Sequence, residues 1–145
     1  MSLHCPDLSI LLPVDGSENS DRAVRLLVSL YAKLAPKEVR VLHVLVPAIP
    51  ADDKLSRPEA VEQNSSDVGK DALQSAQALL SGAGIPYTSA IRRGYVAQEI
   101  ASYAKDLHCS AIIMGTRGMG TTEQILGSIV RQVVALTAIR VTLVK

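Results

Sequence analysis

The segment AIIMGTRGMGTTEQILGS, residues 111–128, sets a short apolar run directly before a stretch with four glycines. A run of this kind is typical of a buried β-strand. Clustered glycines behind it indicate a main chain that takes positive φ or comes very close to another group. The amide hydrogens of such a loop can converge on an anion, and Gly127-Ser128 lies at or near a helix start, where phosphate is favoured. The segment therefore predicts a strand, a turn and a helix that either cradle a phosphate or only redirect the chain.

Short apolar runs and helical stripes alternate along the rest of the chain. The expected strands are 8–14, 39–46, 87–92, 110–115 and 140–145. Apolar residues recur with helical spacing in 24–34, 73–80, 96–107 and 126–136. Three of the strands are nearly continuous apolar runs, as expected when helices cover both faces of a parallel sheet. The alternation predicts a doubly wound α/β fold with an open, five-stranded parallel sheet.

The length of 145 residues and a hydrophobic content of 48% fit one domain over residues 1–145. Residues 47–66 interrupt the alternation. They contain prolines and many polar side chains, and their apolar residues follow no clear period. We expect this segment to be a mobile loop.

Composition excludes several classes of partner. The net charge of +1 comes from 15 basic and 14 acidic side chains without long blocks, so we expect no nucleic-acid or anionic-lipid partner. The apolar runs are too short to cross a membrane and no secretion signal is evident, so we expect a cytoplasmic protein. Two scattered cysteines and three scattered histidines do not form a zinc motif or a disulfide framework. With only four tyrosines and no Trp or Phe, any bound base must be held by aliphatic side chains and backbone.

Ligands of open parallel sheets bind beyond the carboxyl ends of the strands, which directs attention to the residues there. Asp15 follows the first expected strand, where a carboxylate can accept from a ribose hydroxyl, coordinate Mg²⁺, or simply shape the start of the next helix. Pro13, Val14 and Val44 could form an aliphatic slot for a flat base, or could be ordinary core residues. His43 alternates with Val44 and should face the other side of its strand as a partly buried histidine.

Four blocks of the sequence, in order, carry a family resemblance: 10–24 (ILLPVDGSENSDRAV), 39–44 (VRVLHV), 94–120 (GYVAQEIASYAKDLHCSAIIMGTRGMG) and 126–145 (LGSIVRQVVALTAIRVTLVK). Together they resemble the universal stress protein family across essentially the whole chain. The family's nucleotide-binding members carry Gly-x-x-Gly, nine further residues, then Gly-Ser or Gly-Thr. Here Gly115 and Gly118 match the opening and Gly127-Ser128 the close, but residues 119–126 form an interval of eight.

The resemblance implies the strand order 3-2-1-4-5 and a site for ATP with Mg²⁺, the metal being held through Asp15. It implies that adenine and ribose contact Pro13, Val14, Asp15 and Val44. It implies that the ribose and phosphates contact Met114, Gly115, Arg117 and Gly118, with Gly127, Ser128 and Ile129 at the phosphate end. It further implies a homodimer that forms through the last strand, 140–145, and an apolar edge strand is a suitable template for such pairing.

The function expected from these residues is that of a dimeric, ATP-holding switch in a stress response. A slow ATPase or an autophosphorylating protein is a second hypothesis, although Asp15, Glu123 and Gln124 are the only nearby groups that could orient a water molecule. A nucleotide-free interaction module is a third hypothesis, because the glycine interval is one residue short.

Overall fold

The structure, a computed structural model, describes residues 8–46, 58–116 and 127–145, with the side chains of 58–68 excluded. Its elements in chain order are β1 (Ser9–Pro13), α1 (Glu18–Leu34), β2 (Glu38–Leu45), α2 (Pro58–Gly82), β3 (Thr88–Arg93), α3 (Val96–Asp106), β4 (Ala111–Gly115), α4 (Ser128–Leu136) and β5 (Arg140–Val144). Within these ranges, none of the helices has the length and hydrophobicity that crossing a membrane requires.

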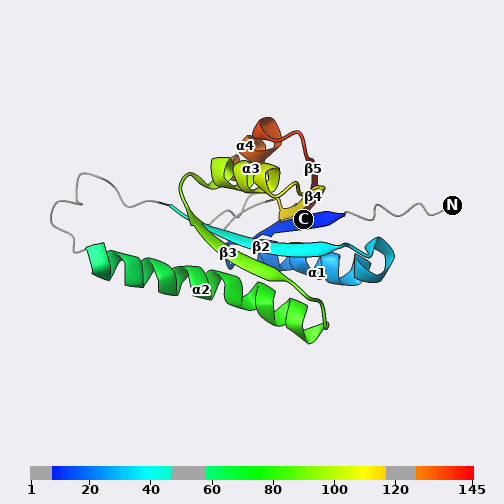
Figure 1. Cartoon of the computed structure of the whole chain (residues 1–145), viewed down its shortest axis with the longest axis horizontal. Coiled ribbons are helices and arrows are strands. Elements are labelled where there is room, and N and C mark those ends of the chain that lie inside the picture. Colours follow the sequence, from blue (N-terminus) through cyan, green and yellow to red (C-terminus); the bar gives the residue numbers. More distant parts are fainter. Residues whose placement is uncertain (1–7, 47–57, 117–126) are drawn as a thin grey trace.

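The five strands form one parallel sheet in the order β3-β2-β1-β4-β5 (Figure 1). The α/β class and the strand order expected from the sequence are therefore confirmed. The chain first builds outward from β1 through β2 to β3, then returns to the other side of β1 for β4 and β5. β1 is consequently the central strand, and the direction of winding reverses beside it.

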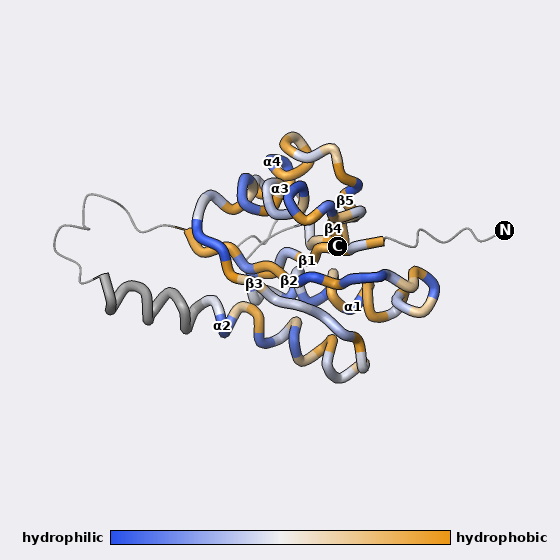
Figure 2. Tube along the Cα trace, in the orientation of Figure 1, coloured by the Kyte–Doolittle hydropathy of each residue, from blue (hydrophilic) through white to orange (hydrophobic). Residues whose placement is uncertain are grey.

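Helices cover both faces of the sheet, with α1 and α2 on one side and α3 and α4 on the other (Figure 1). Successive residues of a strand point to opposite faces, so Ile10 and Leu12 pack with α1 and α2 while Leu11 packs with α3 and α4. All five residues of β1 are buried. The hydropathy colouring in Figure 2 shows hydrophilic residues at the start of β2 and at the end of edge strand β3. Burial on both faces explains the continuous apolar run of the sequence.

The turn between β1 and α1 is built from the segment DGS. Ser17 is the N-cap of α1, and its hydroxyl oxygen accepts a hydrogen bond from the Ser20 N–H (3.2 Å). Asp15 Oδ1 accepts from the Ser17 N–H (2.9 Å), and Gly16 provides the positive φ of 82° between them. Asp15 therefore shapes the start of α1, which was one of the readings that the sequence allowed.

Gly115, the last residue of β4, lies against the first turn of α1. A Cβ atom built on Gly115 would lie 2.7 Å from the backbone oxygen of Asn19, closer than real Cβ contacts come. A glycine is needed here because β4 and α1 approach each other so closely. Part of the glycine content of the opening segment thus has a packing explanation that involves no ligand.

The loop predicted for residues 47–66 is wrong for its second half, because α2 begins at Pro58 and residues 58–66 are helical. Residues 47–57 lie outside the described residues. Proline suits the first position of a helix, since its fixed φ is already helical and that N–H has no intrahelical partner. Among the described side chains of α2, Leu73, Ala76 and Leu80 lie in the core. A helix anchored there can extend backward by adding one hydrogen bond per residue, without an apolar period to reveal it.

Replacing Gly115 by alanine should lower the free energy of unfolding by about 1–3 kcal/mol, because the added methyl group overpacks the contact with α1. Urea denaturation measures the change. Gly82→Ala is the matched control, since a Cβ on Gly82 meets nothing within 4 Å. If Gly115→Ala were as stable as Gly82→Ala, the close approach of β4 and α1 would not be the reason for this glycine.

Candidate functional site

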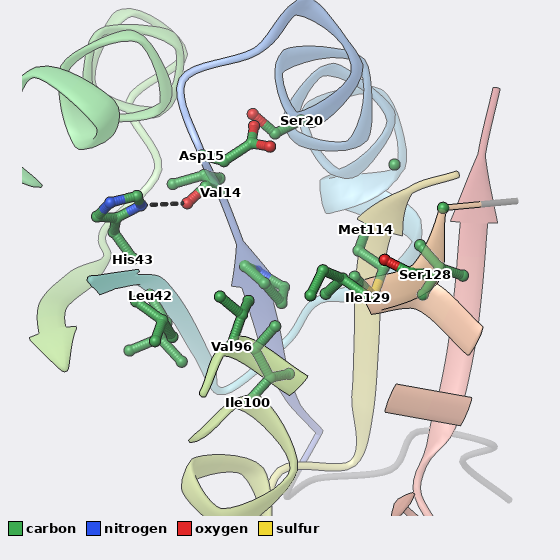
Figure 3. Close-up of a pocket in the computed structure, with 15 residues that line it drawn as sticks. Val14, Asp15, Ser20, Leu42, His43, Val96, Ile100, Met114, Ser128 and Ile129 are labelled. Atoms are coloured by element: carbon green, nitrogen blue, oxygen red, sulfur yellow. Dashed lines mark hydrogen bonds between the residues drawn. The ribbon is translucent and has the colours of Figure 1, made fainter. Parts of the chain in front are cut away.

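A cavity of about 310 Å³ opens at the carboxyl edge of β1, β2 and β4, between these strands and the first turns of α3 and α4 (Figure 3). This volume is at the lower end of the range for small-molecule sites. The cavity lies where the winding of the sheet reverses, which is the usual ligand position in such folds. Its lining residues are Pro13, Val14, Asp15, Ser20, Leu42, His43, Val44, Val96, Ile100, Met114, Gly115, Gly127, Ser128, Ile129 and Val130.

Every predicted site residue that the structure describes lines this one cavity: Pro13, Val14, Asp15, Val44, Met114, Gly115, Gly127, Ser128 and Ile129. Arg117 and Gly118, which were predicted to line the ribose and phosphates, lie outside the described residues. Residues more than 100 positions apart in the chain are thus brought to one place. Parallel pairing produces this convergence, because it places the carboxyl ends of β1, β2 and β4 at one edge.

One part of the cavity wall is aliphatic. Val14, Val44 and Met114 are buried, with exposed fractions of 5%, 7% and 6%. Val96 and Ile100, one turn apart on α3, face the same space from the other layer (Figure 3). Sequence reasoning assigned these α3 residues only to the core. Their position in the first turns of the helix that follows β3 could have indicated their contact with the site, because helices of this fold begin near the carboxyl edge.

The polar side chains in the lining are Asp15, Ser20, His43 and Ser128. Asp15 is held in the turn by its bond to the Ser17 N–H, and the Ser20 hydroxyl donates to the Ser17 backbone oxygen (2.9 Å). The described lining contains no lysine or arginine. A charged ligand in the described part of this cavity would therefore meet backbone amides, hydroxyls, one imidazole and one carboxylate.

The start of α4 supplies the backbone amides. Gly127 is its N-cap with extended backbone (φ −63°, ψ 154°), and among the described residues no side chain makes a capping hydrogen bond to the helix. The first turn carries no acidic residue, so the N–H groups of Ser128, Ile129 and Val130 have neither an intrahelical partner nor a neighbouring carboxylate of that turn. These donors and the positive end of the helix dipole make this end of the cavity suitable for an anion.

His43 also reaches the site, although its side chain leaves β2 on the opposite face from Val44, as the alternation predicted. Its ring is buried, with 9% of the residue exposed, and Nδ1 lies 2.8 Å from the backbone oxygen of Val14. Figure 3 shows the ring beside Val14, to the left of the aliphatic wall. The periodicity of β2 could not predict this contact, because it depends on where β1 ends.

Comparison with known proteins agrees with the geometry. The profile of the universal stress protein family matches residues 8–145. Universal stress protein YxiE of Bacillus subtilis is 30% identical over 145 aligned residues, which cover 94% of this chain and 97% of YxiE. The solved structure of the hypothetical protein MJ0577 has a TM-score of 0.79 at 27% identity, covering 97% of this chain and 96% of that one.

Other solved structures share the fold at lower identity. UspA from Lactobacillus plantarum has a TM-score of 0.79 at 22% identity, covering 98% of this chain and all of that one. A universal stress protein in complex with cAMP has a TM-score of 0.70, and a family protein from Arabidopsis thaliana with AMP bound has one of 0.67, at 18% and 16% identity. These two cover 97% and 95% of this chain, and 98% and 91% of their own. The family match over nearly the whole chain, joined to the observed strand order, shows that this protein belongs to the universal stress protein family.

Proposed function

We propose that the protein binds an adenine nucleotide, ATP with Mg²⁺ in particular, in the cavity at the carboxyl edge, and acts as a dimeric switch in a stress response. One observation carries the proposal: a single cavity joins an aliphatic wall to the start of α4, which no described side chain caps. A nucleotide base can pack against the aliphatic wall, and a phosphate can accept hydrogen bonds from the N–H groups of the helix start. The complexes of family proteins with cAMP and AMP support the same ligand class.

At the base end, the backbone of Val44 is suited to read adenine. Successive residues of a strand direct their backbone groups to opposite neighbours. The Leu42 oxygen accepts from Val14 N–H on the β1 side (2.8 Å), whereas the Leu45 oxygen accepts from Gly94 N–H on the β3 side (3.0 Å). Val44 therefore turns its N–H and C=O to the β1 side, past the last residue of β1. These two groups can donate to a ring nitrogen of adenine and accept from its amino group, with Val14 and Met114 on its faces.

At the sugar, the Asp15 carboxylate can accept from a ribose hydroxyl or bind Mg²⁺. Magnesium usually keeps several waters and takes one or two carboxylates together with substrate phosphates. No group of three His, Cys, Asp or Glu side chains that could hold a metal occurs among the described residues. The single carboxylate of the described lining suits a magnesium ion that arrives with the nucleotide, and Asp15 would hold it there.

At the phosphate end, the N–H groups of Ser128 and Ile129 would donate to phosphate oxygens. Gly115 lines the cavity on the β4 side. Arg117 and Gly118 would complete the cradle, with Arg117 supplying a charge-assisted contact. The described lining has no other cation, so Arg117 and Mg²⁺ would together offset the negative charge of a triphosphate.

The dimer would form through β5. This strand pairs with β4 on one side and is an edge strand of the sheet on the other. Unpaired backbone groups on such an edge are a template for a second copy, and pairing of residues 140–145 with themselves gives a closed twofold assembly. On the adjacent α4, Val134 and Leu136 are about half exposed, with fractions of 50% and 53%, and would add apolar area to this interface.

Nucleotide binding should raise the melting temperature. A ligand at about 100 times its Kd adds about 2.7 kcal/mol of stability. A thermal-shift series with ATP, ADP, AMP, cAMP and GTP, each with and without Mg²⁺, should give its largest shift with ATP and Mg²⁺ and little with GTP. No shift with any adenine nucleotide would reject the proposal and favour the nucleotide-free interaction module.

Ser128→Pro should weaken phosphate binding without unfolding α4. Proline is favoured at the first helical position, and the extended backbone of Gly127 is compatible with a following proline. The substitution removes one N–H donor to the anion, so calorimetry should show the affinity for ATP and AMP falling by about tenfold or more.

Two comparisons make the Ser128 experiment specific. Ser128→Ala keeps the N–H and removes the hydroxyl, so it should bind ATP almost as wild type does. Adenosine, which has no phosphate, should bind wild type and Ser128→Pro equally. Unchanged ATP affinity in Ser128→Pro would mean that the start of α4 is not the phosphate site.

The proposed dimer predicts a mass near twice the 15.4 kDa of the chain by light scattering after gel filtration. The mass should fall toward that of one chain only on strong dilution. A mass of one chain at every concentration tested would contradict pairing through β5.

A further inference from the structure

The hydrogen bonds between β1 and β2 depart from a regular parallel ladder at Val14. Pro13 is paired with Leu42, so Val14 is the position opposite His43. Val14 N–H donates to the Leu42 oxygen at 2.8 Å, as the ladder requires. The next bond of a regular ladder would join Val44 N–H to the Val14 oxygen. Within the described residues, no backbone hydrogen bond connects Val44 with Val14.

The imidazole of His43 takes the place of that missing bond. Its Nδ1 lies 2.8 Å from the Val14 oxygen, and Figure 3 draws this contact as a dashed line. A carbonyl oxygen only accepts, so Nδ1 carries the hydrogen. The same bond can form with the neutral ring protonated at Nδ1 and with the imidazolium, so the contact does not depend on one protonation state.

We infer that His43 is a positioning residue that binds the Val14 carbonyl and thereby leaves the Val44 amide available to the ligand. Val44 lines the cavity and is buried, with an exposed fraction of 7%. A buried amide without a partner is costly, so an amide withheld from the ladder is left for water or a ligand acceptor. We call the bonding of the Val14 carbonyl to His43 instead of to the Val44 amide the diversion of that carbonyl. The identity of the ligand rests on the proposed function, whereas the diversion does not.

The diversion also affects the choice of base. With its N–H available, Val44 presents a donor and an acceptor from one residue, which matches the ring nitrogen and amino group of adenine. Guanine presents a ring N–H and a carbonyl oxygen at the corresponding edge. Its ring N–H would face the Val44 N–H, so that two donors would oppose each other. If the Val14 oxygen accepted a hydrogen bond from the Val44 N–H, that N–H could no longer donate to adenine. The preference of the protein for adenine over guanine would then decrease.

Amide hydrogen exchange by NMR tests the diversion without any nucleotide. In the wild-type protein the Val44 amide should exchange at least about tenfold faster than the Leu42 amide, which also faces β1 but lies within the paired ladder. In His43→Leu the Val14 oxygen can accept from Val44, so the Val44 amide should become protected. Equal protection of the two amides in wild type, or no change in His43→Leu, would overturn the inference.

Two variants separate positioning from general stability. His43→Asn can place an amide N–H near the position of Nδ1 and should keep the Val44 amide fast, even if His43→Leu folds poorly. Val39→Ala removes a buried contact on the same strand, with Val39 only 3% exposed and outside the cavity lining. Val39→Ala should lower stability but leave the ratio of Val44 to Leu42 exchange unchanged. A change in that ratio equal to the one in His43→Leu would assign the effect to stability alone.

Calorimetry with AMP, GMP and ribose 5-phosphate tests the consequence for binding. His43→Leu should lose about tenfold in AMP affinity and most of the preference over GMP, while ribose 5-phosphate binds as it does to wild type. Unchanged AMP affinity and selectivity in His43→Leu would overturn the assigned role. If wild type binds no nucleotide at all, the proposed function fails, and the exchange experiment still decides whether His43 diverts the Val14 carbonyl.

Discussion

The pairing of β1 with both β2 and β4 is the constraint on which the rest of the structure depends. Because β1 is the central strand and all five of its residues are buried, helices must cover it on both faces of the sheet. The chain must then leave β1 at the carboxyl edge of the sheet. β1 ends at Pro13 opposite Leu42, while β2 continues to Leu45. The space beyond the shorter strand is the candidate site, with the starts of α3 and α4 above it. The cavity is therefore a consequence of strand lengths and order, to which individual side chains add the chemistry.

Several residues at this edge serve the fold and also line the candidate site. Asp15 holds the turn into α1 by accepting from Ser17, yet it also lines the cavity. Gly115 permits the contact between β4 and Asn19 and also lines the cavity. His43 joins β2 to the residue that follows β1. Such double roles mean that a loss of binding in a variant must be compared with its stability before a ligand contact is assigned.

The sequence predicted the fold well because the signals were local. The apolar run around Leu11 identified a strand buried on both faces, and the stripes identified the helices. The start of α2 was missed because its first residues, from Pro58, carry no apolar period. Among the site residues, Val14 and Val44 followed from their positions at strand ends. The contact of His43 with Val14 could not be predicted, since it depends on how separate elements meet in space. Val96 was assigned only to the core, although its place at the start of α3 could have indicated its contact with the site. Arg117 and Gly118 remain predictions.

The central claim is that the cavity between β1, β2, β4 and the starts of α3 and α4 holds an adenine nucleotide. The most direct test is a crystal structure of the protein grown with ATP and Mg²⁺ at millimolar concentration. The account predicts adenine between Val14 and Met114, bonded to the backbone of Val44, with phosphates at the N–H groups of Ser128 and Ile129. A cavity that stays empty of nucleotide, or is filled by the protein's own side chains, would contradict it.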